Sequence, residues 1–229
     1  MARGPESGHT TPVRVPSGDQ SLNGDLGIPP QSHGIVLFAH GSGSSRHSPR
    51  NQYVARALEH RGLATLLIDL LTPEEEAIDD RTAQYRFDIE MLADRLVTIV
   101  DWLRRRNDTS SLPIGLFGAS TGGGAALMAA AARPREIGAV VSRGGRPDLA
   151  GTSLARVTSP TLLIVGGLDT PVIEMNRDAM RQMHAEVTLE IVPGATHLFE
   201  EPGTLERVAE LAGNWFSRCL QPALPARPR

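Results

Sequence analysis

The sequence predicts an α/β protein built on a mainly parallel sheet with helices on both faces. Short runs of leucine and β-branched residues, each of strand length, alternate along the chain with longer helical segments. This alternation is typical of a parallel sheet, in which a helix carries the chain back between successive strands. The strand runs contain few polar residues, which indicates strands that are buried on both faces. With 229 residues and 40% hydrophobic composition, the chain is large enough for a substantial core.

The expected elements follow one another in a regular order. A weak hairpin is expected at 13–15 and 20–28, and six strands follow at 35–39, 63–69, 112–117, 139–142, 161–165 and 187–192. Helices are expected at 49–61, 87–106, 120–133, 172–184 and 204–220. One further helix start is indicated by a capping box, Thr72-Pro73-Glu74-Glu75. We expect one domain over 12–220, with flexible tails at 1–11 and 221–229 that are rich in Pro, Arg, Gly and Ser.

Composition and charge argue against several classes of function. A formal net charge of -3 and a pI near 6.2 provide no basic face for nucleic acid. No stretch approaches the roughly 18 uncharged residues that a membrane span needs. The single cysteine, Cys219, has no internal disulfide partner, which fits the cytoplasm. Cys and His pairs at zinc-ligand spacing are absent from the sequence, so we expect neither a metal nor another cofactor.

A serine between two glycines is the candidate nucleophile. In Gly118-Ala119-Ser120-Thr121-Gly122, an apolar strand gives way to an alanine-rich helix. A strand, sharp turn and helix in this order hold a serine Oγ clear of the sheet, and the glycines let the two backbones pass closely. Glycines at 122, 123 and 124 each disfavour a helix by roughly 1 kcal/mol against alanine, so close packing is expected to require them. A Gly-rich turn without chemistry is the alternative.

Asp169 and His197 are the candidates for the groups that activate this serine. A serine hydroxyl needs a histidine within hydrogen-bond reach, and a carboxylate to hold the tautomer of that histidine. Each candidate follows a different expected strand, and Ser120, Asp169 and His197 occur in that order along the chain. Since ligands meet parallel sheets at the carboxyl ends of strands, we expect the three side chains to converge. Taken singly, Asp169 is equally well explained as a helix cap, and His197 as an exposed loop residue.

Two backbone N–H groups are candidates for an oxyanion hole. The first is that of Thr121, directly after the serine. The second belongs to the loop His40-Gly41-Ser42-Gly43, which follows the strand at 35–39, and we assign it to Ser42 with Gly41 as the second choice. His40 is expected to brace this loop rather than transfer protons.

With these motifs, the chain resembles an α/β-hydrolase, and more narrowly a dienelactone-hydrolase-like serine hydrolase, over about residues 12 to 220. The resemblance implies a mainly parallel sheet of about eight strands and hydrolysis of a small-molecule ester or lactone. Dienelactone hydrolases proper use cysteine as nucleophile, whereas this chain has Ser120. No long insertion separates the strands at 139–142 and 161–165, so little or no lid is expected.

Two arginines after a strand, Arg143 and Arg146, are candidates for binding an anionic part of the substrate. Dienelactone hydrolases similarly use arginines for a substrate carboxylate. A structural ion pair, with Asp148 as partner, explains them equally well.

Other functions remain as alternatives: a thioesterase or peptidase with the same three residues, and a hydrolase-fold binding protein without turnover. A nucleotide enzyme is disfavoured, because Arg46 stands where a Gly-x-Gly-x-x-Gly fingerprint needs its last glycine.

Overall fold

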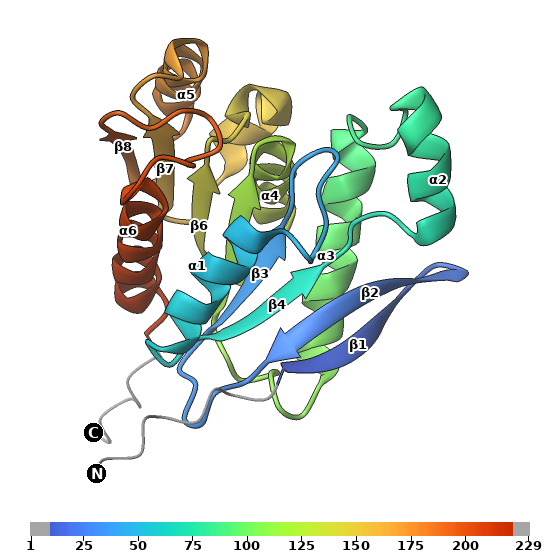
Figure 1. The fold of residues 1–229 in the computed structure, drawn as a ribbon. Helices are drawn as coiled ribbons and strands as arrows, with labels where there is room; N and C mark the ends of the chain where they lie inside the picture. Colours follow the sequence, from blue (N-terminus) through green and yellow to red (C-terminus); the bar gives the residue numbers. More distant parts are fainter. Residues whose placement is uncertain (1–9, 222–229) are drawn as a thin grey trace.

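Eight strands form one sheet in the computed structural model, which describes residues 10–221 (Figure 1). The strand order is β1-β2-β4-β3-β5-β6-β7-β8. The pairs β1–β2 and β2–β4 are antiparallel, and the pairs from β4 to β8 are parallel. The strands are β1 (Thr10–Ser17), β2 (Gln20–Gly27), β3 (Ile35–Ala39), β4 (Ala64–Ile68), β5 (Ile114–Ala119), β6 (Ile137–Arg143), β7 (Thr161–Gly166) and β8 (Val187–Val192). The expected fold class is confirmed.

The first strand begins earlier than the sequence indicated. β1 begins at Thr10, inside the expected tail at 1–11, and pairs with β2 along its whole length. Thr10 and Thr11 are exposed, so the ladder of backbone hydrogen bonds orders them and no hydrophobic signal marks them in the sequence. Residues 1–9 and 222–229 of the expected tails lie outside the described residues.

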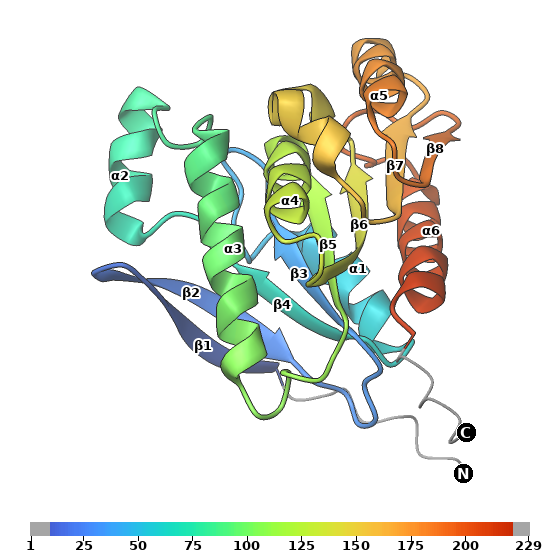
Figure 2. The ribbon, with the colours of Figure 1, turned by 180° about the vertical axis from the view of Figure 1, so that it is seen from behind.

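Helices cover both faces of the sheet (Figures 1 and 2). Successive strand residues point to opposite faces, so Phe117 joins a core with one helix layer and Leu116 joins a core with the other. The Phe117 face carries α1 (Pro49–Glu59) and α6 (Thr204–Cys219), and the Leu116 face carries α3 (Ile89–Arg105), α4 (Thr121–Ala132) and α5 (Thr170–Gln182). Within residues 10–221, no helix has the length and apolar character needed to cross a membrane.

The close approach of α4 to the sheet depends on glycine. A Cβ at Gly122 would lie 2.2 Å from the carbonyl oxygen of Ala39 and 2.6 Å from that of His40. A Cβ at Gly118 would lie 2.5 Å from the carbonyl oxygen of Gly122. These distances leave no room for a side chain at either position, so close packing requires glycine at 118 and 122. The first turn of α4 is thereby held against the end of β3.

Two shorter helical segments lie at the carboxyl edge of the sheet. The helix α2 (Pro73–Thr82) begins at the expected capping box, in which both reciprocal hydrogen bonds are present, and it ends at Ala83 with a φ of +56°. It projects beyond α3 in both views (Figures 1 and 2). The 3₁₀ segment η1 (Pro147–Arg156) connects β6 to β7 and packs against α4 and α5.

Candidate active site

Ser120 occupies the sharp turn between β5 and α4. Its φ of +51° and ψ of -122° lie in a region that L-residues rarely adopt. Such a conformation persists only where surrounding contacts hold it. Here the Ser120 N–H donates to the carbonyl oxygen of Arg143 at 3.2 Å, and the Ser120 carbonyl oxygen accepts from the N–H of Arg146 at 3.0 Å. The turn predicted from the glycine pattern is therefore present, and the loop after β6 holds it in place.

The structure brings Asp169 and His197 together. The Nδ1 of His197 and the Oδ2 of Asp169 lie 2.6 Å apart, with the carboxylate largely buried and the imidazole more than one-third exposed. Asp169 precedes α5 but makes no side-chain capping hydrogen bond, so the carboxylate faces the imidazole instead of the helix. This pairing leaves Nε2 of His197 as the ring nitrogen available to a reactant.

The loop that carries His197 also meets the loop that holds Ser120. Gly144 has a φ of +52°, and a Cβ there would lie 3.5 Å from both Cε1 and Nδ1 of the His197 ring. Gly144 directly follows Arg143, whose carbonyl oxygen accepts from Ser120. Among the described residues, no hydrogen bond joins Ser120 to His197. The two groups share one edge of the sheet through the 143–146 loop.

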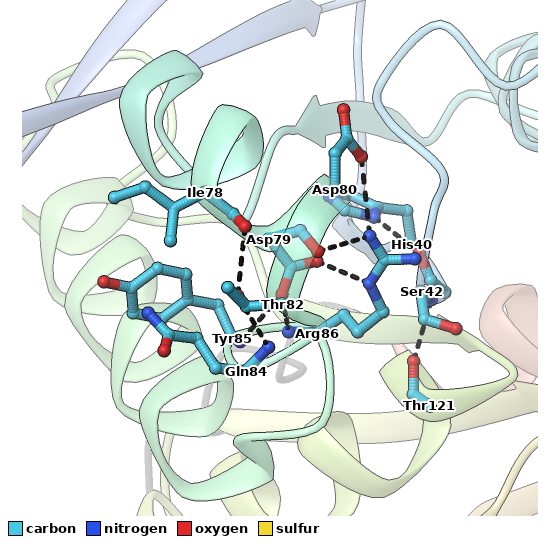
Figure 3. A network of polar contacts seen from close by, with 11 residues as sticks. His40, Ser42, Ile78, Asp79, Asp80, Thr82, Gln84, Tyr85, Arg86 and Thr121 are labelled. Carbon is cyan, nitrogen blue, oxygen red and sulfur yellow. Dashed lines mark hydrogen bonds and ion pairs between the residues drawn. The ribbon is translucent and has the colours of Figure 1, made fainter.

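The two expected oxyanion donors are neighbours, but one of them already has a partner. The N–H of Ser42 donates to the side-chain Oγ1 of Thr121 at 2.9 Å (Figure 3). The side chain of Thr121 is buried at the start of α4. Gly41 packs directly against Ser120, because a Cβ there would lie 3.0 Å from Cβ of Ser120. The loop after β3 therefore meets the Ser120 turn, as expected from the sequence, and the Thr121 hydroxyl lies between the two.

His40 braces this loop, as expected. Its Nδ1 lies 2.9 Å from the carbonyl oxygen of Gly41, and its Nε2 accepts from the N–H of Leu70 at 2.9 Å. These contacts require a neutral ring with the proton on Nδ1. Burial lowers the pKa of His40 and outweighs the opposing effects of the Gly41 contact and of Asp69. The ring therefore has neither a free nitrogen nor a charge for proton transfer.

A small cavity of about 30 Å³ lies between this loop and α2. It is bordered on one side by Ser42 and Thr121 and on the other by Arg86, which follows α2 (Figure 3). The guanidinium of Arg86 is held by Asp79, with Nε 2.5 Å from Oδ2, and lies 3.4 Å from Oδ1 of Asp80. No sequence signal marks this ion pair, because the turn at Ala83 that brings the residues together contains no glycine. The pair gives the cavity a polar wall.

The two candidate arginines have different environments in the structure. Arg146 forms a bidentate ion pair with Asp148, at 2.9 and 2.7 Å, which is the structural alternative considered for it. Arg143 is 7% exposed, and its Nε and Nη1 have no hydrogen-bond partner in the described part of the chain. Its guanidinium lies 5.9 Å from the ring centroid of Phe199, two residues after His197. Burial, with a smaller contribution from Arg50, lowers the pKa of Arg143 to about 10.

The fold and the edge where these loops meet define an α/β hydrolase. The chain belongs to the dienelactone hydrolase family, whose model matches residues 22–221. It is similar to a solved dienelactone hydrolase from Anabaena variabilis, with 60% identity, a TM-score of 0.93, and coverage of 94% of this chain and 100% of that one. In residues 10–221 no three His, Cys, Asp or Glu side chains are grouped so that they could hold a metal ion.

Other relatives extend the comparison. A lidless α/β serine hydrolase from Xanthomonas campestris shares the fold at 21% identity and a TM-score of 0.73, with 94% of this chain and 97% of that chain covered. A Mycobacterium tuberculosis H37Rv protein, provisionally named a phosphoribosyl transferase, is 59% identical over 204 residues. These residues make up 89% of this chain but 45% of that relative, so the chain spans about half of its length.

Proposed function

We propose that this protein hydrolyses carboxylic esters or lactones, with Ser120 as nucleophile, His197 as general base and Asp169 as the partner that orients the imidazole. The observation that carries the proposal is the 2.6 Å contact between His197 Nδ1 and Asp169 Oδ2, made by loops that share an edge with the strained Ser120 turn. A carboxylate on Nδ1 fixes the tautomer in which Nε2 accepts a proton. Family membership supports hydrolysis as the class of reaction.

The reaction follows from these positions in two halves. The Oγ of Ser120 attacks the ester carbonyl carbon while its proton passes to Nε2 of His197, and the carbonyl oxygen becomes an oxyanion near Thr121 and Ser42. The intermediate then collapses, the bond to the alcohol oxygen breaks, and that oxygen takes the proton from His197. Water adds to the acyl-enzyme by the same route and releases the acid. In a lactone the alcohol and acid are two ends of one product.

Thioesters and peptides contain the same acyl centre, so a thioesterase or peptidase uses the same steps with a different leaving group. Esters and lactones are favoured by the family. The transferase name belongs to a relative of which this chain spans 45%. A serine in a strand–turn–helix beside a His–Asp pair favours acyl hydrolysis over phosphoribosyl transfer. A binding protein without turnover has no need of these groups.

For substrate binding, we propose Arg143 rather than Arg146. The Arg146 charge is neutralised by Asp148, whereas the buried Arg143 guanidinium faces no carboxylate among its described contacts. A buried cation without a partner is costly, and a substrate anion would offset that cost. The carbonyl oxygen of Arg143 accepts from the Ser120 N–H, so such an anion would bind near the acyl centre.

The test of the proposal is labelling by a fluorophosphonate together with hydrolysis of p-nitrophenyl acetate. Ser120→Ala should abolish labelling and lower kcat by roughly 10⁴- to 10⁶-fold while the circular dichroism spectrum stays native. Asp169→Asn should lower kcat by up to about 10⁴-fold, as tautomer control is lost. An alanine variant that turns over at the native rate, or labelling at another serine, contradicts the assignment.

A further inference from the structure

The contact between the loop after β3 and the first residue of α4 indicates an additional catalytic group. We infer that the side-chain hydroxyl of Thr121 donates a hydrogen bond to the oxyanion, and that the N–H of Ser42 acts on the oxyanion through this hydroxyl. The inference rests on the proposed function, because it assigns a further donor to the same acyl centre. It gives Thr121 two roles, one for its backbone N–H and one for its side chain.

The first step is the direction of the hydrogen bond between Ser42 and Thr121. A backbone N–H only donates, so the Oγ1 of Thr121 accepts at the observed 2.9 Å. A hydroxyl that accepts from one group keeps its own proton for another. Ser42 and Thr121 are 79 residues apart in the chain, so this bond fixes the β3 loop against the nucleophile turn.

The second step concerns the proton of that hydroxyl. A threonine in a helix often donates to a carbonyl oxygen three or four residues earlier. Thr121 is the first residue of α4, and among the hydrogen bonds of residues 10–221 none is donated by its hydroxyl. The side chain is 4% exposed, and a buried donor without an acceptor costs about 1–3 kcal/mol. An acceptor supplied by the substrate relieves this cost.

The third step is the place of the hydroxyl relative to the reacting atoms. Thr121 directly follows Ser120, and its Oγ1 lies within hydrogen-bond distance of the Ser42 N–H (Figure 3). A carbonyl carbon attacked by Ser120 carries its oxygen toward the N–H of Thr121, which is the first expected donor. The Ser42 N–H is directed at Oγ1, so the hydroxyl stands between that N–H and the oxyanion. Donation from Ser42 also polarises the hydroxyl and strengthens its own hydrogen bond.

During attack by Ser120, the Thr121 hydroxyl would stabilise the negative charge that develops on the carbonyl oxygen. As Ser120 Oγ adds to the carbonyl carbon, the carbon–oxygen double bond becomes single and the oxygen gains negative charge, while the serine proton passes to His197. The Thr121 hydroxyl stays protonated throughout and only donates. Its hydrogen bond becomes stronger as the charge develops, so it stabilises the transition state more than the bound ester.

The experiment compares Thr121→Val, Thr121→Ser and native enzyme on p-nitrophenyl acetate. Valine keeps the shape and the backbone N–H but lacks the hydroxyl, so kcat should fall by about 10²-fold with KM nearly unchanged. Serine keeps the hydroxyl and should restore most of the rate. Affinity for a boronic acid, which mimics the tetrahedral intermediate, should weaken in parallel with kcat/KM in the valine variant. Thr98→Val, on α3, removes a half-buried hydroxyl that donates to the backbone carbonyl oxygen of Asp94, and it should leave kcat unchanged.

Three results would overturn the inference: a valine variant with native or higher kcat, a loss confined to KM, or boronic acid affinity that stays native while the rate falls. A native or higher kcat would mean that the hydroxyl only accepts a hydrogen bond from the Ser42 N–H. A loss confined to KM, or native boronic acid affinity with a reduced rate, would mean that the hydroxyl only positions the loop. Failure of the proposed function is distinguishable, because native enzyme would then neither turn over esters nor be labelled by a fluorophosphonate at Ser120.

Discussion

Replacing Gly122 by alanine tests the packing of α4 against β3. The added Cβ would lie 2.2 Å from the Ala39 carbonyl oxygen, whereas ordinary contact begins at 3.4 Å. Because the contacted atom is backbone, strand or helix must shift, and overpacking of this kind costs about 3 kcal/mol. Alanine regains roughly 1 kcal/mol of helix propensity. The net loss of about 2 kcal/mol should lower Tm by about 4–8 °C in a chain of this size.

Thermal unfolding followed by circular dichroism measures this effect, and Gly123→Ala is the matched control. Both changes gain the same helix propensity. A Cβ at Gly123 would meet the side-chain Oγ of Ser142 at 2.6 Å, an atom that moves by rotation about one bond, and the backbone Cα of Gly145 at 3.1 Å, a far milder approach than the 2.2 Å at Gly122. The control should therefore stay within about 1 kcal/mol of native. Since Ala39 leads into the loop of Ser42, Gly122→Ala should also lower kcat well below its Tm. A Tm for Gly122→Ala equal to or above native would refute the packing argument.

Two further predictions concern charged groups. Arg143→Met should raise KM for a p-nitrophenyl ester bearing a carboxylate by about 10- to 100-fold, which corresponds to the loss of a charged hydrogen bond, and should leave KM for a neutral ester of equal length unchanged. Arg146→Met is the control. Equal increases in KM for both esters would contradict the proposal. Burial alone would raise the pKa of Asp79, but hydrogen bonds from Arg86 and Tyr85 hold it below its ordinary value. Its stabilising effect is therefore complete above about pH 4 and is lost as pH falls through the folded-state pKa. Asp79→Asn should lower Tm at pH 7 and flatten the dependence of Tm on pH in acid, and a curve parallel to the native one from pH 2 to 6 would contradict this.

Much of the fold could be predicted because its signals are local. The strands β3 and β8 have the expected bounds, and the helices agree within about two residues at each end. Apolar runs, capping residues and glycines act over a few positions, so they are readable in one sequence. The convergence of Asp169 with His197 was predicted by a topological rule, since parallel strands end at one edge.

The remaining features depend on residues that are distant in the chain. The hydrogen bond from Ser42 to Thr121 spans 79 positions, and nothing in either segment marks it. Arg143 ends β6 and has the type of side chain usually found at a surface, yet it is buried, with its guanidinium close to the Phe199 ring. Burial of a charge arises from packing of several elements, which local patterns do not encode.

The groups proposed for catalysis follow strands that differ in how many neighbouring strands stabilise them. Ser120 follows β5, which is flanked by β3 and β6. His197 follows β8, which lies at the edge of the sheet, pairs only with β7 within residues 10–221, and has mostly half-exposed side chains. Local opening is favoured where few buried contacts must be broken. Fraying of the β8 edge would therefore displace His197, the proposed base, while the Ser120 turn stays folded. Local opening of this edge, which amide hydrogen exchange measures, would then limit the proposed activity on warming before global unfolding does.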